Sequence, residues 1–263
     1  MFHGRLADGH EVRHRSAICH RSSVDICGTH VNGWILLFVG MAAVTAKMIA
    51  IEGLDGSGKE TQANLLCEAL EARGANVASI SFPRYGHPSA APVEEYLRGH
   101  YGEHASDVNA YAASALFAVD RIGSYLGEWR RLYETSDVLI ADRYTTSNAI
   151  HQLSKLPRDE WEGFASWLFD FELNKLRLPA PNKVVYLRTD VELSQRLLEK
   201  RYGGDQSKRD VHERDIGYLV RSHDAADWCA EWLGWLTVEC VRDGEMRGRE
   251  DVHEEIMAKA GFR

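Results

Sequence analysis

A glycine-rich stretch near residue 50 has the spacing that most directly indicates chemistry. Residues 48–62 read MIAIEGLDGSGKETQ and meet the pattern G-x-x-x-x-G-K-[ST] from Gly53 through Lys59. In such a loop the backbone amides surround phosphate oxygens, and the lysine supplies a mobile cation. The pattern fails at Glu60, where a hydroxyl residue normally holds magnesium, and Thr61 comes one place late. The alternative interpretation is a tight glycine turn with an exposed lysine.

Charged residues also stand at the ends of two apolar segments further along the chain. SDVLIADRY, residues 136–144, ends in Asp142, the position where nucleotide-binding folds carry a carboxylate linked to a metal or an arginine. Arg143 has the planar fork that suits a phosphate, and FPRY, residues 82–85, adds Arg84 near the same edge. A strand-end ion pair remains the simpler alternative.

Two helical spacings place polar or aromatic groups on one face. Asn148, His151 and Gln152 stand at i, i+3 and i+4, so one helix face would present three polar groups. Phe117 and Arg121 stand at i and i+4, where a ring could stack on a base while a guanidinium bonds its edge. A solvated face, or a core phenylalanine beside a surface arginine, would have the same spacing.

The last stretch whose residues could take part in a reaction is RYGGDQSKRDVHERD, residues 201–215. Its basic residues Arg201, Lys208 and Arg209 on a glycine-containing loop could close over a transferring phosphoryl group. Asp210 and Glu213 follow at i and i+3. A charged surface loop is the alternative that composition alone favours.

The elements between these residues alternate between strand and helix. Strands are predicted at residues 49–52, 76–82, 136–144 and 236–241, and a turn followed by a strand at 179–188. Mainly helical chain is predicted at 60–73, 92–135 and 145–178 and after 189. Thr189 to Glu192 has the spacing of a capping box, and two more helices flank the last strand. This order predicts an α/β fold of three layers, a five-stranded parallel sheet flanked by helices, with ligands at the carboxyl ends of its strands.

Composition limits the function classes. The 263-residue chain carries a net charge of −8, which argues against a general nucleic-acid partner. Five scattered cysteines without a CxxC pair favour a reducing, cytoplasmic setting.

The first 47 residues differ from the rest. Residues 1–33 lack periodicity, and the apolar stretch at 34–46 is shorter than the roughly 20 residues of a membrane span. We expect no membrane partner, an extension that is disordered or lies upstream of the true start, and a working domain at 48–263.

Five blocks together resemble one family. IEGLDGSGK, FPRYG, LFAVDR, ADRYTTSNAIHQ and RDVHERD, in this order, are similar to bacterial thymidylate kinases, P-loop nucleoside monophosphate kinases that phosphorylate thymidine monophosphate. The resemblance implies a P-loop NTPase fold with a short lid near 200–210, ATP with Mg²⁺, thymidine monophosphate as acceptor and a homodimer. A different nucleotide or nucleoside kinase is the nearest alternative. A catalytically inactive binding protein is another alternative. A GTPase-type switch is disfavoured because Asn182-Lys183 is followed by two valines, without the aspartate of an N-K-x-D motif.

The resemblance also implies a role for individual residues. ATP would be bound by Gly53, Asp55, Gly56, Ser57, Gly58, Lys59, Glu60 and Thr61. The acceptor would be bound by Phe82, Arg84, Tyr85, Phe117, Arg121, Asp142, Arg143, Asn148, His151, Gln152 and Glu213. The catalytic set would be Lys59, Arg143, Asp55, Arg201 and Arg209, with Asp55 and Asp210 near the metal. Gly56 fits the family branch whose catalytic arginine comes from the lid.

Two positions depart from the family pattern. His151 falls where family members usually carry Tyr or Phe against the sugar, which leaves selectivity against a 2′-hydroxyl open. Glu60 replaces the usual hydroxyl residue, and we expect it to lie outside the first coordination shell of the magnesium.

Overall fold

A five-stranded parallel sheet is the centre of the fold in the computed structural model, which describes residues 48–205 and 209–262. The predicted extension at residues 1–47 lies outside the described residues. The strand order is β2-β3-β1-β4-β5. The strands are β1 (Met48–Gly53), β2 (Val77–Ser81), β3 (Val138–Asp142), β4 (Lys183–Arg188) and β5 (Leu236–Glu239). The predicted parallel sheet is therefore confirmed, and its carboxyl edge collects the ends of all five strands.

Strand β1 is buried along its whole length because helices cover both faces of the sheet. Met48 and Ala50 pack into one hydrophobic core, whereas Ile49 and Ile51 pack into the core on the opposite face. This alternation follows from the two-residue period of a strand. A continuous apolar run is typical of such a doubly covered parallel strand.

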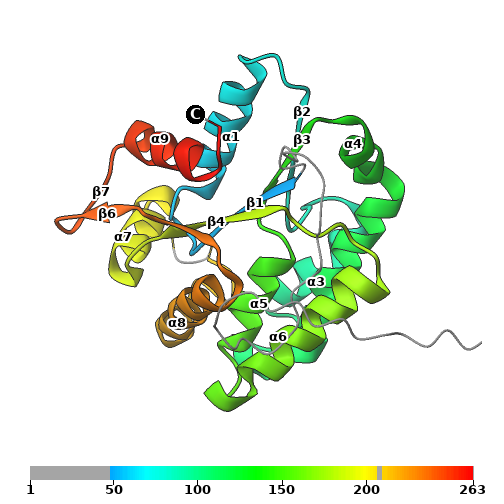
Figure 1. The fold of residues 1–263 in the computed structure, drawn as a ribbon. Coiled ribbons are helices and arrows are strands. Elements are labelled where there is room, and N and C mark those ends of the chain that lie inside the picture. Colours follow the sequence, from blue (N-terminus) through cyan, green and yellow to red (C-terminus); the bar gives the residue numbers. More distant parts are fainter. Residues whose placement is uncertain (1–47, 206–208, 263) are drawn as a thin grey trace, which may run out of the picture. The chain divides into compact units, whose positions relative to one another are not determined.

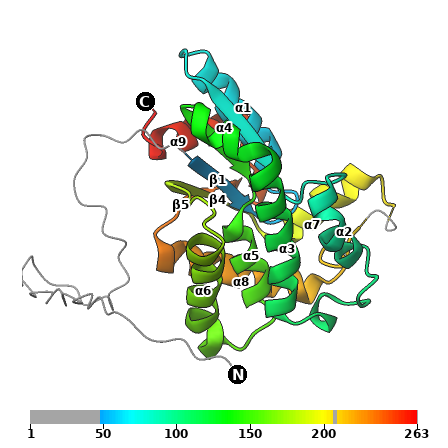
Figure 2. The same cartoon turned by 90° about the vertical axis from the view of Figure 1, so that its right-hand side faces the viewer.

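Helices form a layer on each face of the sheet (Figures 1 and 2). Helices α1 and α9 cover one face, and α3, α5, α6 and α8 cover the other. The α-helices are α1 (Lys59–Glu71), α2 (Ala91–Leu97), α3 (Ala110–Ser124), α4 (Arg130–Thr135), α5 (Thr145–Leu153), α6 (Trp161–Phe169), α7 (Val191–Tyr202), α8 (Ile216–Leu233) and α9 (Arg249–Lys259). The predicted three-layer architecture is confirmed.

Short segments of tighter or wider helix join these elements. The 3₁₀ turns are η1 (Pro88–Ala90), η2 (Ala105–Asp107) and η4 (Arg158–Glu160). Two π-helical segments, η3 (Tyr125–Trp129) and η5 (Asp170–Lys175), continue α3 and α6. In the part of the chain that the structure describes, no helix is long and apolar enough to cross a membrane.

Three local predictions are wrong. The residue that precedes α7 is Asp190, no side chain caps that helix, and the hydroxyl of Thr189 is buried without a partner among the described residues. The fifth strand ends at Glu239, since the chain then turns into an antiparallel ribbon of β6 (Val241–Arg242) and β7 (Glu245–Met246). Arg201, expected on a loop, belongs to the last turn of α7.

Candidate active site

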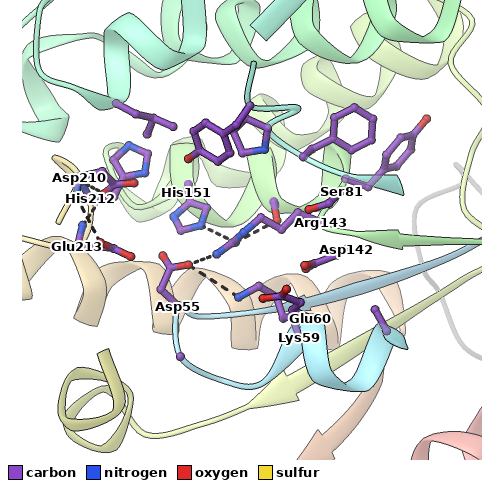
Figure 3. Close-up of a pocket in the computed structure, with 18 of the residues that line it drawn as sticks. Asp55, Lys59, Glu60, Ser81, Asp142, Arg143, His151, Asp210, His212 and Glu213 are labelled. Atoms are coloured by element: carbon purple, nitrogen blue, oxygen red, sulfur yellow. Dashed lines mark hydrogen bonds and ion pairs between the residues drawn. The ribbon is translucent and has the colours of Figure 1, made fainter. Parts of the chain in front are cut away.

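A cavity of about 890 Å³ lies at the carboxyl ends of β1, β2 and β3 (Figure 3). The glycine-rich loop forms one wall, and side chains from α3 and α5 form another. Segments more than 60 residues apart in the sequence, Asp142–Arg143 and Asp210–Glu213, line the same cavity. The fold therefore brings residues from all five sequence blocks to one cavity.

The glycine-rich loop leads directly from β1 into α1. Gly58 precedes the helix with a φ of 89°, so the amides of the first turn open toward the cavity. A side chain at Gly53 would place its Cβ 2.5 Å from the hydroxyl of Ser57, and one at Gly56 would meet the Ser194 carbonyl at 3.0 Å. Only glycine fits this tight path, which leaves the loop amides and the positive end of α1 available for an anion.

Lys59 is buried at the first position of α1, with its ammonium group in the cavity wall. Its Nζ donates a hydrogen bond of 2.8 Å to the Leu54 carbonyl and lies 3.9 Å from Asp55 Oδ1. Burial, followed by the nearby Arg143 cation, lowers the Lys59 pKa to about 8. An anionic ligand would favour the charged form, because an opposite charge offsets desolvation.

Arg143 and Asp55 form an ion pair across the cavity. Arg143 has a φ of 66°, a left-handed conformation that is uncommon for a non-glycine residue, and its amide donates to the Ile51 carbonyl. Burial alone would raise the Asp55 pKa, but the cations of Arg143 and Lys59 outweigh it and hold that pKa well below its usual range. Asp55 is therefore a permanent carboxylate beside two cations.

The buried carboxylate of Glu52 holds the backbone turn that orients Arg143. It accepts hydrogen bonds from the amide of Tyr144 at 3.0 Å and from the hydroxyls of Thr146 and Ser147. Burial raises the Glu52 pKa, and the hydroxyl donors oppose that rise. These bonds join β1 to the start of α5 and fix the direction in which Arg143 leaves the sheet.

A second region of the cavity is lined by α3 and α5. Arg121 and Glu172 are both buried and form a bidentate ion pair, with two N–H···O bonds of 2.6 Å. Asn148 Nδ2 donates to the same carboxylate at 3.0 Å. Phe117 lies one turn before Arg121 and also lines the cavity. An aromatic face beside a fixed guanidinium and an amide suits a planar, hydrogen-bonding ring such as a nucleobase.

Several polar atoms near the cavity are buried without a hydrogen-bond partner among the described residues. They are Asn148 Oδ1, both amide atoms of Gln152, His151 Nδ1 and Asp142 Oδ1. All four residues line the cavity. Because buried polar groups are normally paired, these atoms indicate a polar ligand.

Asp210 and Glu213 supply acidic groups opposite the loop. Asp210 accepts hydrogen bonds from the amides of His212 at 2.8 Å and Glu213 at 2.9 Å. Burial, aided by the charges of Asp55 and Glu213, raises the Asp210 pKa to about 7. A cation bound nearby would favour the carboxylate form.

We expect the raised pKa of Asp210 to make stability depend on pH. The folded protein binds this proton more tightly than the unfolded chain, in which the aspartate has its ordinary pKa of 3.8. The stabilising contribution of the bound proton is therefore lost as pH rises from about 4 to about 7. Urea unfolding of the metal-free protein and of Asp210→Asn at several pH values measures the effect. The native protein should lose stability relative to the variant over that window, and a constant difference would contradict the assignment.

Glu60 extends away from the cavity centre. Its side chain is 73% exposed, and its carboxylate lies 3.7 Å from the guanidinium of Arg201. That Glu60 lies outside the first coordination shell of the magnesium stays a prediction. An acid in the first turn is also favourable beside the positive end of α1.

The structure brings most of the predicted site residues to one cavity. Its lining includes Asp55, Gly56, Gly58, Lys59, Glu60, Thr61, Phe82, Tyr85, Phe117, Arg121, Asp142, Arg143, Asn148, His151, Gln152, Arg201, Asp210 and Glu213. Lys208 lies outside the described residues.

Four predicted residues do not line it. Gly53 and Ser57 pack closely against each other within the loop. The Arg84 guanidinium pairs with Glu128 at 2.8 Å in a neighbouring hollow, and Arg209 donates to Gln195 at 2.6 Å.

Sequence reasoning missed Glu172 and His212. Glu172 follows the apolar stripe Trp161, Ala165 and Leu168 at helical spacing, so an acid on a buried face was a signal for a cationic partner. His212 lines the cavity and stacks on His151 with ring centroids 5.3 Å apart. Nothing in the sequence around His212 identified that contact.

The fold and the site define a P-loop nucleotide-binding protein whose cavity has a second region suited to a planar ring. A family model described as "Thymidylate kinase" matches residues 51–227. The chain belongs to the thymidylate kinase family.

Individual relatives agree with this assignment. The chain is 37% identical over 194 residues to a thymidylate kinase of Mycobacterium tuberculosis (strain H37Rv), which covers 71% of this chain and 89% of that protein. It is 29% identical over 158 residues to a thymidylate kinase of Bifidobacterium longum (strain DJO10A), covering 59% of this chain and 73% of that protein.

Proposed function

We propose that the protein transfers the γ-phosphoryl group of ATP to thymidine monophosphate, forming thymidine diphosphate and ADP for dTTP synthesis. The observation that carries the proposal is the pairing of a phosphate loop with a base-sized pocket across one cavity. Phe117 provides the aromatic face of that pocket, and Asn148 and Gln152 provide unpartnered polar atoms. Family membership supports the identity of the acceptor.

The transfer requires alignment and charge stabilisation rather than a covalent intermediate on the protein. An oxygen of the acceptor phosphate forms a bond to the γ-phosphorus while the bond to the β-γ bridging oxygen breaks, and ADP leaves with that electron pair. Lys59 and the loop amides hold the donor phosphates in the proposed arrangement. Arg143 and Arg201 both line the cavity, and in this arrangement Arg143 would contact the transferring phosphoryl group while Arg201 approaches from α7.

The residues present fit a magnesium ion. Among the described residues no group of three or more ligating side chains could hold a metal alone. Mg²⁺ usually binds one or two carboxylates together with substrate phosphates and water. Asp55 and Asp210 are the carboxylates that would hold it, and the ion would neutralise the charge that develops on the transferring group.

A coupled ADP-release assay over a panel of acceptors tests the proposal. Turnover is expected with thymidine monophosphate and not with free thymidine. Uridine, deoxyuridine and ribothymidine monophosphates separate selectivity for the base from selectivity for the sugar, which His151 leaves open. Turnover with another monophosphate and none with thymidine monophosphate would contradict the assignment, and nucleotide binding without any turnover would favour an inactive binding protein.

We expect Glu60→Thr to leave activity nearly unchanged. Because Glu60 is largely exposed, a hydroxyl at this position adds little to a metal already bound by carboxylates and phosphates. Steady-state kinetics with titrated magnesium measures the effect. If the variant raised magnesium affinity and turnover severalfold, the absence of a hydroxyl at residue 60 would limit the activity of the native protein. Glu71→Thr, on the last turn of α1, is a matched control outside the cavity lining.

We further propose a cytoplasmic homodimer. ATP as donor supports the location. An exposed apolar stripe along α3 and η3 supports the assembly, since Tyr111, Val119 and Leu126 are 46%, 47% and 68% exposed and recur at helical spacing.

A charge on this stripe is expected to separate the subunits. Leu126→Glu should convert a dimer to a monomer, because an unpaired charge at a buried interface is costly. Sedimentation velocity measures the state. Val220→Glu, with the same change at an exposed residue of α8, should stay dimeric. A native protein that sediments as a monomer would refute the proposed assembly.

A further inference from the structure

Lys155, beyond the end of α5, is a buried amine that the proposed phosphoryl transfer does not use. Its Nζ donates hydrogen bonds to the Tyr96 hydroxyl at 2.9 Å and to the Val108 carbonyl at 3.1 Å. None of the carboxylates in the described ranges forms an ion pair with it, and burial lowers its pKa to about 7. Burying a lysine in this way opposes folding, which points to a role for the amine in positioning its hydrogen-bond partners.

Tyr96 connects this amine to the cavity. Its buried hydroxyl lies 2.8 Å from His212 Nε2 and 3.4 Å from the Ala105 carbonyl. Lys155 in its charged form can only donate, so the Tyr96 oxygen accepts from it and the Tyr96 proton is free to go elsewhere. The shorter contact leads that proton to His212 Nε2, which then accepts and leaves the ring proton of His212 on Nδ1.

The second histidine is fixed from the opposite side. Arg143 Nη1 lies 3.3 Å from His151 Nε2, and because a guanidinium has no acceptor, His151 accepts there and carries its proton on Nδ1. The two rings stack with an interplanar angle of 22°, and the Tyr218 ring packs against His212 with centroids 4.8 Å apart. Burial, followed by the Arg143 charge, lowers the His151 pKa to about 3, so this ring is neutral.

We propose that Lys155 and Tyr96 are positioning residues that hold His212 as the neutral Nδ1–H tautomer, stacked on His151, for contact with an oxygen of the acceptor nucleotide. Both rings line the cavity. The series of contacts runs from Lys155 through Tyr96 to His212, and then across the stacked rings through His151 to Arg143. The nature of the ligand rests on the proposed function, whereas the tautomer of His212 does not.

The tautomer is measured on the ligand-free protein. Two-bond ¹H–¹⁵N correlation spectra of ¹⁵N-histidine-labelled protein near pH 6 should assign the Nδ1–H form to His212. The Tyr96→Phe variant removes only the hydroxyl and should move His212 toward the Nε2–H form. An Nε2–H tautomer in the native protein, which would arise if Tyr96 donated to Ala105 instead, would overturn the proposal. A Tyr96→Phe spectrum identical to the native one would overturn it as well.

Kinetics then tests whether the tautomer serves the acceptor site. Tyr96→Phe and Lys155→Met should each raise the KM for thymidine monophosphate about tenfold while kcat changes far less, because binding loses one positioned donor. The double variant should resemble each single variant, since the two residues act through one chain. Additive effects of the two substitutions on KM, or a loss confined to kcat, would contradict the proposed positioning role.

Matched controls lie elsewhere in the fold. Tyr186→Phe removes a buried hydroxyl that donates to Asp227, and Lys183→Met removes an amine that donates to the Ala260 carbonyl. Neither residue lines the cavity, and both variants should keep the native KM. If the native protein shows the Nδ1–H tautomer but no turnover with thymidine monophosphate, the proposed function fails while the tautomer assignment stands.

Discussion

Replacing Lys59 by methionine is expected to lower kcat for thymidine monophosphate by about 10²–10³, the usual effect of removing one preorganised electrostatic group at a reacting centre. Methionine fills a similar volume without the charge, so the buried start of α1 keeps its packing. The loss should fall mainly on kcat, because the lysine interacts most strongly as charge develops on the transferring group. Coupled steady-state kinetics at saturating ATP and magnesium gives the values.

Loss of folding must be separated from loss of chemistry. The Lys59→Met protein should retain cooperative urea unfolding and should bind an ATP analogue measurably by calorimetry. Lys175→Met is a matched control, since Lys175 is 70% exposed and its partner among the described residues is Asp170. A Lys59→Met enzyme with native kcat would show that the loop lysine takes no part in the transfer.

Replacing Glu172 by glutamine is expected to reduce the free energy of unfolding by about 3–5 kcal/mol, because it leaves the buried Arg121 cation without its counter-ion. Glu172 is fully buried and also accepts from Thr145 at 2.9 Å and from Asn148. Urea unfolding measures the loss. The variant should also bind thymidine monophosphate weakly, because the glutamine amide keeps one acceptor oxygen where Arg121, Asn148 and Thr145 share two.

The exposed pair of Arg130 and Glu134 provides the comparison. These residues lie at i and i+4 on α4, joined by a hydrogen bond of 2.8 Å, and both are more than half exposed. Glu134→Gln should leave unfolding unchanged, because solvent screens such pairs. Equal effects at Glu134 and Glu172 would show that the buried pair has no special weight. A double variant, Arg121→Met with Glu172→Met, should recover stability but not nucleotide binding.

Local spacing predicted those parts of the site that lie within one element. Phe117 and Arg121 share a face because a helix repeats every 3.6 residues, and the glycine pattern placed Lys59 at a helix start. The parallel sheet followed from alternating apolar segments, and its strand order brings Asp142 and Asp55 to one cavity. These predictions needed only periodicity and a sheet whose strands end at one edge.

Contacts between distant segments could not be predicted in this way. Arg121 meets Glu172 across 51 residues, and Arg84 meets Glu128 across 44, so each arginine had an acid partner that no local pattern specifies. The spacing from Thr189 to Glu192 also fits a capping box, yet no side chain of the described residues caps α7. Tertiary packing decides such cases, and the predicted role of Arg84 at the acceptor phosphate stays a prediction.

The network around Glu172 has a thermodynamic consequence for recognition. Arg121, Asn148 and Thr145 are held by protein partners in the ligand-free state, so an entering base does not have to order them. Binding should therefore lose little side-chain entropy on this side of the cavity. A pocket fixed in advance adapts poorly to rings of other shapes, and discrimination among bases would then come from rigidity rather than from closure around the correct one.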